Sequence, residues 1–168
     1  MVEILLPGFP IRFTVAGGAV GFSIDGVEPG AELRTERLNS QVSYVAAMPE
    51  VRNQVNEWLR GMTKLGDLVV EGRDIGTAVF PAATFKFYLD ASPEERARRR
   101  CAEMAGQGNG VNKKDISESL KNRDTIDRSR QKDPLKTAPD AVIVDSTGMA
   151  IEDVVAVILA RVKQTISK

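Results

Sequence analysis

Arg73 and Asp74 stand side by side immediately after the apolar run 68–71 and Gly72. A guanidinium group binds phosphate through two parallel hydrogen bonds, and a carboxylate accepts a hydrogen bond from the amino group of a base. In open α/β sheets, ligands bind beyond the carboxyl ends of the strands. If 68–71 is a strand, this pair lies where a phosphorylated substrate would be met. A surface turn held by an Arg–Asp pair is the simpler alternative.

A second charged group lies in the sequence NRDTIDRSR, residues 122–130. Arg123 and Asp127 are four residues apart, and so are Asp124 and Arg128. This spacing places the members of each pair on one face of a helix, so a solvated helix with ion pairs is one interpretation. The other interpretation, contact with a charged ligand, depends on a resemblance described below.

Residues 9–62 predict a β-hairpin followed by two helices. Two short runs of alternating residues flank a pair of glycines, which is typical of a hairpin. The second helix is predicted because Pro49 suits its first turn and apolar residues follow on one face. The expected elements are strands at 11–15 and 20–24 and helices at 31–43 and 49–60.

From residue 63 onward, continuous apolar runs alternate with helical segments. Such runs are typical of strands buried on both faces of a parallel sheet. Ser92 followed by Pro93 predicts a helix start, because serine caps a helix and proline fits its first position. The glycine-rich segment 105–112 predicts a mobile lid connection. The expected elements are strands at 68–71, 85–89 and 141–144, a helix that follows Ser92, and helices at 115–130 and 151–166.

The composition excludes several kinds of chemistry. The chain has 168 residues, enough for one substantial core, and contains no histidine. Ser–His–Asp and Cys–His nucleophilic schemes and the usual zinc sites are therefore ruled out. Cys101 is the only cysteine, so no internal disulfide and no metal site is expected. Any chemistry must use carboxylates, arginines, lysines and backbone amides.

Charge and hydropathy narrow the expected partners and location. Lysine plus arginine and aspartate plus glutamate each number 23, so the overall charge favours no polyanionic partner. The arginines at 96 and 98–100 lack interleaved aromatic residues on which bases would stack, so no nucleic-acid partner is expected. No apolar run approaches the roughly 18 residues of a spanning helix, and no signal pattern is present. A cytoplasmic location without membrane contact is the expectation.

The stretch around Arg73, the segment SPEERARRR at 92–100 and the segment NRDTIDRSR at 122–130 together resemble the bacterial cytidylate kinases. The resemblance runs from about Phe9 to the C-terminus in unbroken order. It implies the α/β fold of the P-loop nucleoside monophosphate kinases, in which helices surround a parallel sheet. It also implies an enzyme of pyrimidine nucleotide metabolism that moves the terminal phosphoryl group of ATP, with Mg²⁺, onto CMP or dCMP.

The resemblance further implies a division of the chain. Residues 9–62, a hairpin plus two helices, would form a small CMP-binding insert. Residues 63–168 would be the remainder of the kinase core, with a lid region at about 100–130.

Residue roles on the acceptor side follow from the same resemblance. Arg73 would hold the α-phosphate of CMP, and Asp74 would recognise the cytosine amino group. Ser43 and Arg52, in the segment SYVAAMPEVR, would read the edge of the cytosine ring. Taken alone, Ser43 and Arg52 are ordinary helix residues.

The segment 122–130 would complete the site. By the resemblance, Arg123 would bind the acceptor phosphate and Asp127 the sugar hydroxyls, while Arg130 would point toward the transferring phosphoryl group. Arg123 and Arg130 are thus the candidate catalytic residues, and Arg99 is a candidate contact for the donor nucleotide. Ile126 stands where the family usually has a further arginine, which removes one cation from the phosphate cluster.

One part of the family pattern has no match. The family opens with a strand and a glycine-rich loop of the type G-x-x-G-x-G-K-G-T, which cradles the donor phosphates, and nothing in this sequence matches it. We therefore expect a kinase fragment that lacks the first strand of the sheet, and a separate N-terminal P-loop fragment is a candidate partner. The alternative is a non-catalytic nucleotide-binding or interaction module of the same family. A basic RNA-binding surface is the third and weakest hypothesis.

Overall fold

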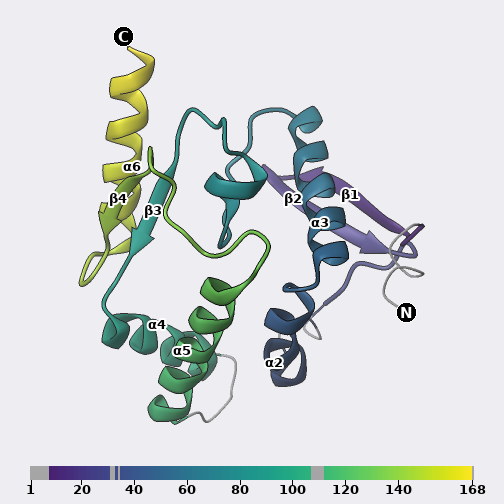
Figure 1. Cartoon of the computed structure of the whole chain (residues 1–168). Helices are drawn as coiled ribbons and strands as arrows, with labels where there is room; N and C mark the ends of the chain where they lie inside the picture. Colours follow the sequence, from purple (N-terminus) through teal and green to yellow (C-terminus); the bar gives the residue numbers. More distant parts are fainter. Residues whose placement is uncertain (1–7, 31–32, 34, 107–111, 168) are drawn as a thin grey trace. The chain divides into compact units, whose positions relative to one another are not determined.

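The computed structural model describes residues 8–30, 33, 35–106 and 112–167 (Figure 1). The chain divides into two compact units. The first unit contains the chain up to Gly72 together with Arg130–Lys132, and the second contains Arg73–Ser129 and Asp133–Lys168.

The first unit begins with the predicted β-hairpin, which is confirmed. Strands β1 (Ile11–Ala16) and β2 (Ala19–Ile24) pair antiparallel in continuous register. Gly17 and Gly18 between them have φ values of 57° and 77°, a left-handed conformation that glycine adopts at little cost. Both strands and their turn are thus encoded within one short segment.

Two helices follow the hairpin in the first unit. Helix α2 (Glu36–Val45) begins later than predicted, and residues 31, 32 and 34 of the expected helix lie outside the described residues. Helix α3 (Pro49–Gly61) has its proline in the first turn, as predicted. Trp58 of α3 contacts Phe13 of β1 edge-on, with ring centroids 6.3 Å apart, which packs the helix against the hairpin.

The strand predicted at 68–71 is wrong. The described residues form two sheets of two strands each, and 68–71 belongs to neither. Val69 in the middle of the run is fully exposed, with a relative accessibility of 105%. An apolar run becomes a strand only when a neighbouring strand takes up its backbone hydrogen bonds, because strand preference depends on tertiary context.

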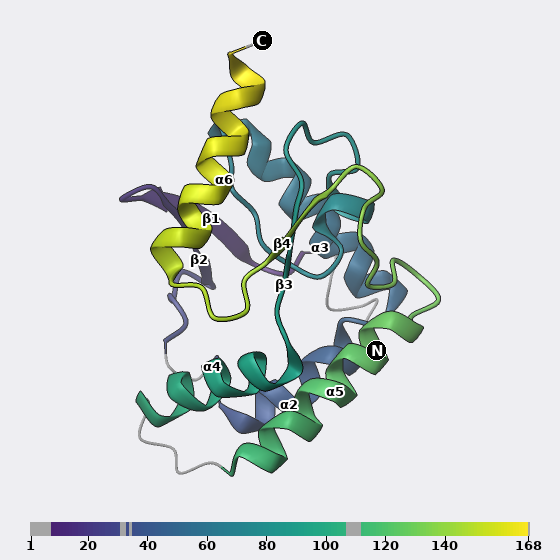
Figure 2. The same ribbon diagram turned by 90° about the vertical axis from the view of Figure 1, so that its left-hand side faces the viewer.

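The second unit holds a small parallel sheet. Strands β3 (Phe87–Asp90) and β4 (Val142–Asp145) pair in parallel, with Phe87 opposite Val142. Both lie within two residues of the strands predicted at 85–89 and 141–144. Helix α6 (Ile151–Ile166) has the predicted bounds and runs alongside this sheet in both views (Figures 1 and 2).

Helices α4 (Pro93–Gly106) and α5 (Lys113–Ser129) lie between the two strands in sequence and pack against each other (Figure 2). The predicted cap is present, because the Glu95 amide donates to Ser92 Oγ at 3.2 Å. Of the predicted lid connection, residues 107–111 lie outside the described residues.

The two units differ in what they bury. The apolar residues that the structure shows as buried all belong to the second unit: Val79, Ala91, Ala97, Ile116, Leu135, Ala138 and Val144. The first unit buries polar side chains among its described residues: Ser43, Arg52 and Asn56. None of the helices in the described part of the chain combines the length and apolar character that crossing a membrane requires.

Candidate functional site

Arg73 is held by two carboxylates of α5. Its Nε donates to Oδ2 of Asp127 at 2.7 Å, and its Nη2 donates to Oδ1 of Asp124. The partners lie 54 and 51 residues further along the chain. Arg73 is therefore not part of a local surface turn paired with its neighbour, which was the simpler interpretation of the sequence.

Asp127 is the most deeply buried member of this group, with a side chain that is 0% exposed. Nε of Arg123, four residues earlier on α5, also lies 3.9 Å from Oδ2 of Asp127. A buried carboxylate needs such partners, since an uncompensated charge in the interior is strongly unfavourable. The backbone carbonyl of Asp127 accepts the Leu135 amide at 2.8 Å, which fixes the chain beyond α5 against it.

Asp124 extends the group to α4. Its Oδ2 accepts from Nη1 of Arg96 at 2.5 Å, while its other oxygen accepts from Arg73. Burial by itself would raise the pKa of Asp124, but the hydrogen bonds from Arg96 and Arg73 lower it below its ordinary value. In the described part of the chain, Asp124 thus pairs with these two arginines rather than with Arg128. We call Arg73, Arg96, Asp124 and Asp127 the Arg73 cluster.

Asp74 lies beside the cluster at the start of a short π-type turn, Ile75–Val79. Its side chain is buried, and its backbone carbonyl accepts the Ala78 amide at 2.8 Å. The residue that follows Arg73 is therefore fixed by the turn that it begins. This turn replaces the expected strand end as the element that presents the Arg–Asp pair.

Three of the predicted site residues belong to the first unit: Ser43, Arg52 and Arg130. Ser43 and Arg52 are buried on α2 and α3, and Nη1 of Arg52 donates to the Ala46 carbonyl at 3.2 Å. Arg130 joins this unit through the segment Arg130–Lys132, and Lys132 donates to Oδ1 of Asn53 on α3. The predicted site residues are thus divided between the two units.

Arg99 contacts the loop that follows β4. Its Nη1 donates to Ser146 Oγ at 3.0 Å, and its Nη2 donates to the Ser146 carbonyl at 2.5 Å. Ser146 is buried and its hydroxyl donates to the Asp90 carbonyl at the end of β3, 2.8 Å away. Nε of Arg99 donates to Glu95 at 2.7 Å. We call Arg99, Ser146 and Glu95 the Ser146 cluster.

The arginines of the run on α4 differ in what they contact. Arg96 and Arg99 reach other elements, whereas the side chain of Arg98 is 65% exposed and pairs with Glu95 on the same helix. Hydrogen bonds from Arg98 and Arg99 lower the pKa of Glu95 to about 2. The arginines of this run therefore point in different directions around the helix.

Sequence reasoning missed Asp124 and Arg96 as members of the candidate site. The available signal for Asp124 was its position three residues before Asp127, which puts both carboxylates on one face of α5. The bonding partners of Ser146 carry no comparable signal, because they come from β3 and α4.

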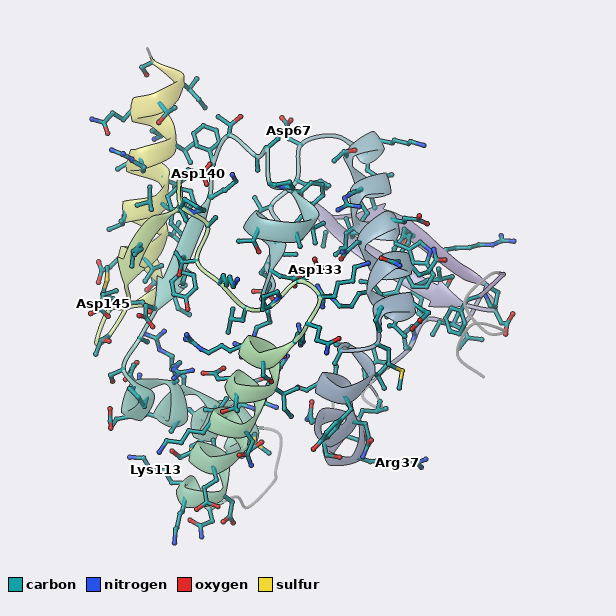
Figure 3. All side chains as sticks on the ribbon, in the orientation of Figure 1. Arg37, Asp67, Lys113, Asp133, Asp140 and Asp145 are labelled. Atoms are coloured by element: carbon teal, nitrogen blue, oxygen red, sulfur yellow. The ribbon has the colours of Figure 1, made fainter. Side chains whose placement is uncertain are left out.

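The described residues contain no cluster of three or more acidic or cysteine side chains that could hold a metal ion. Figure 3 shows labelled acidic residues of the second unit, Asp140 and Asp145, at separate places. Asp140 binds Lys86 at 2.6 Å, and Asp145 accepts the Thr147 amide at 2.9 Å.

A small parallel sheet with crossover helices, and arginines gathered on buried carboxylates, fits the nucleoside monophosphate kinase class of fold. The model of the cytidylate kinase family matches residues 8–164. The chain belongs to the cytidylate kinase family, which is a family of phosphotransferases.

Several curated cytidylate kinases are similar to the chain along most of its length. That of Oleidesulfovibrio alaskensis is 40% identical over 162 residues, which cover 96% of this chain and 74% of the relative. That of Pectobacterium carotovorum is 39% identical over 157 residues, covering 94% and 70%. That of Pelotomaculum thermopropionicum is 44% identical over 149 residues, covering 89% and 66%.

Proposed function

We propose that this chain binds CMP or dCMP as the acceptor in phosphoryl transfer from ATP. The observation that carries the proposal is the guanidinium of Arg73, fixed on the buried Asp127 and on Asp124. A cation held in one orientation before the ligand arrives loses little freedom on binding, which favours a phosphate group. Arg123 lies beside the same carboxylate and adds a second cation on the same side of α5.

Base recognition is assigned to Asp74, Ser43 and Arg52. A carboxylate at Asp74 suits the exocyclic amino group of cytosine, which uracil replaces with a carbonyl. Ser43 and Arg52 would contact other polar atoms of the ring. This assignment makes residues 9–62 the CMP-binding insert and 63–168 the kinase core.

Asp127 has two candidate roles, and its environment favours one of them. The family resemblance assigns it to the sugar hydroxyls. Because its side chain is fully buried and bonded to Arg73, the structure favours the holding of Arg73 as its role in the ligand-free chain. A ribose contact would require neighbouring side chains to move.

The donor side is proposed to use Arg130 and Arg99, with ATP and Mg²⁺ as the source of the phosphoryl group. The bond between Arg99 and Ser146 places this arginine at the carboxyl end of β4, the side of a parallel sheet where ligands bind. Residues at about 100–130 would form the lid, of which 107–111 lie outside the described residues.

Calorimetry with CMP, dCMP and UMP tests the acceptor site. We expect binding of CMP and dCMP, weaker binding of UMP, and a loss of about tenfold or more in CMP affinity on Arg73→Lys, because lysine keeps the charge but loses the fork. Arg98→Lys is the matched control, since Arg98 is exposed on α4. Equal affinity for CMP and UMP would contradict the role of Asp74, and no binding of CMP would overturn the proposal.

The second candidate function is a nucleotide-binding module without catalysis. No segment of this sequence matches the glycine-rich loop that cradles donor phosphates in the family. We expect no CDP formation above background from ATP, Mg²⁺ and CMP with this chain alone. CDP formation that disappears on Arg130→Gln would instead show a complete kinase.

A separate fragment that carries the P-loop strand remains a candidate partner for the second unit. The two-stranded sheet of β3 and β4 exposes Leu89 and Ile143, and so small a sheet gains stability from further strands. We expect a peptide with the family's P-loop strand, its loop and the helix that follows it to raise the melting temperature, by binding the folded form only. A melting temperature unchanged by the peptide would contradict this partner.

A further inference from the structure

Asp124 is the member of the Arg73 cluster that joins two arginines from different elements. One of its oxygens accepts from Nη2 of Arg73, and the other accepts from Nη1 of Arg96 on α4 at 2.5 Å. The side chain of Asp124 is only 17% exposed. Asp124 therefore holds Arg73 and, through Arg96, links it to α4.

The geometry leaves one edge of Arg73 open. Asp124 and Asp127, one turn apart on α5, accept from its Nη2 and Nε, the two nitrogens of one edge of the guanidinium plane. Among the described residues, Nη1 of Arg73 makes no hydrogen bond, and the side chain is one third exposed. The outer edge, formed by Nη1 and the second hydrogen of Nη2, is available for phosphate oxygens.

A single anchor would not fix this orientation. With Asp127 alone, Arg73 is held at Nε, and the far end of the guanidinium can swing about that point. The bond from Nη2 to Asp124 removes this freedom, and the bond from Arg96 keeps Asp124 itself in place.

We propose that Asp124 is a positioning residue for phosphate binding, which turns the outer edge of Arg73 toward the nucleotide and couples that orientation to α4 through Arg96. The inference deepens the proposed function and rests on it. Asp124 contacts Arg73 and not the reacting atoms, so it acts through the arginine.

The direction in which one substitution changes CMP affinity distinguishes a positioning role of Asp124 from competition between Asp124 and phosphate. If Asp124 merely competed with phosphate for Arg73, Asp124→Asn would tighten CMP binding, because a nearby negative charge is removed. If Asp124 positions Arg73, the same change weakens CMP binding by about tenfold, the value of one charge-assisted hydrogen bond.

Calorimetry with CMP and with cytidine measures the direction of this change in affinity. We expect Asp124→Asn to weaken CMP binding and to leave cytidine binding unchanged, because cytidine has no phosphate. Glu118→Gln is the matched control, an acid-to-amide change at an exposed position of α5. CMP binding that is equal or tighter in Asp124→Asn would overturn the proposal, and so would an equal loss for cytidine.

A ligand-free measurement separates this inference from the proposed function. In ¹⁵N-labelled protein, hindered rotation of the Arg73 guanidinium should be visible by NMR and should be lost in Asp124→Asn, while the Arg73 Nε–H stays bonded to Asp127. Arg96→Gln should make the rotation of the Arg73 guanidinium less hindered, though by less than Asp124→Asn does. Arg98→Gln is the control for this variant. Unchanged rotation in both variants would overturn the positioning role. Hindered rotation in a wild-type chain that binds no CMP would overturn the proposed function alone.

Discussion

Two arginine clusters share helix α4 and differ in what holds the arginine. In the Arg73 cluster, two carboxylates of α5 compensate the charges of Arg73 and Arg96, and one carboxylate is fully buried. In the Ser146 cluster, Arg99 is bonded to a neutral hydroxyl and a backbone carbonyl, and its one ionic partner among the described residues is Glu95 on the same helix. The first cluster is an interior ion-pair network, and the second is a hydrogen-bonded tether with a surface ion pair.

This difference predicts which cluster tolerates the loss of a member. Removing the buried Asp127 leaves the partly buried charge of Arg73 without its Nε acceptor, whereas a surface ion pair is worth little because water replaces it. Stability should therefore depend far more on the carboxylates of α5 than on Glu95.

The largest expected effect is that of Asp127→Ala. The change leaves Arg73 without its Nε acceptor and removes a fully buried carboxylate, so the free energy of unfolding should fall by about 3 kcal/mol, the lower end for broken buried pairs because Arg73 is one third exposed. Urea denaturation measures it. The control is Glu118→Ala on the exposed face of α5, for which less than about 0.5 kcal/mol is expected. A loss below about 1 kcal/mol for Asp127→Ala would show that the network is not an interior one.

A smaller effect is expected in the second cluster. Ser146→Ala removes the hydrogen bond from its hydroxyl to the Asp90 carbonyl and the acceptor of Arg99 Nη1, and should cost about 1–2 kcal/mol of unfolding free energy. Ser119→Ala, an exposed serine of α5, is the control. In a double-mutant cycle with Arg99→Gln, the two losses should not add, because the residues share a bond. Additive losses would contradict the tether.

The elements that sequence reasoning predicted well are those with local signals. The two glycines of the hairpin, Pro49 at the start of α3 and the Ser92–Pro93 start of α4 each act within a few residues of the element that they define. The run 68–71 failed because its conformation depends on neighbouring strands, and such partners are not visible in the run itself.

The candidate site shows the same limit. The spacing of Arg123 and Asp127 predicted a local pair, and Nε of Arg123 lies 3.9 Å from Oδ2 of Asp127 in the structure. The stronger partner of Asp127 is Arg73, which is 54 residues away, and no helical spacing could indicate it. The family resemblance brought Arg73 and Asp127 together as parts of one site, but their direct bond and the place of Asp124 between Arg73 and Arg96 are visible only in the structure.

The smallest expected effect is on the free energy of unfolding at acid pH. There the contribution of Glu95 can be distinguished from that of its neighbour Glu94. Hydrogen bonds from Arg98 and Arg99 lower the pKa of Glu95 from 4.5 to about 2, so their contribution is complete above pH 4.5 and disappears as the pH falls through about 2. Glu95→Gln should therefore lower stability slightly at neutral pH and by progressively less as the pH falls below 4.5. Glu94→Gln, an exposed neighbour in sequence, is the control and should follow the wild-type curve.

Urea midpoints at neutral pH and at about pH 3 would measure the difference between each variant and the wild type. Asp124, Asp140 and Asp145 also have lowered pKa values, but their contributions are shared by variant and wild type and cancel in this comparison. A Glu95→Gln deficit that stays constant with pH would show that Glu95 acts through packing, and that the charge on the Ser146 cluster is irrelevant to its stability.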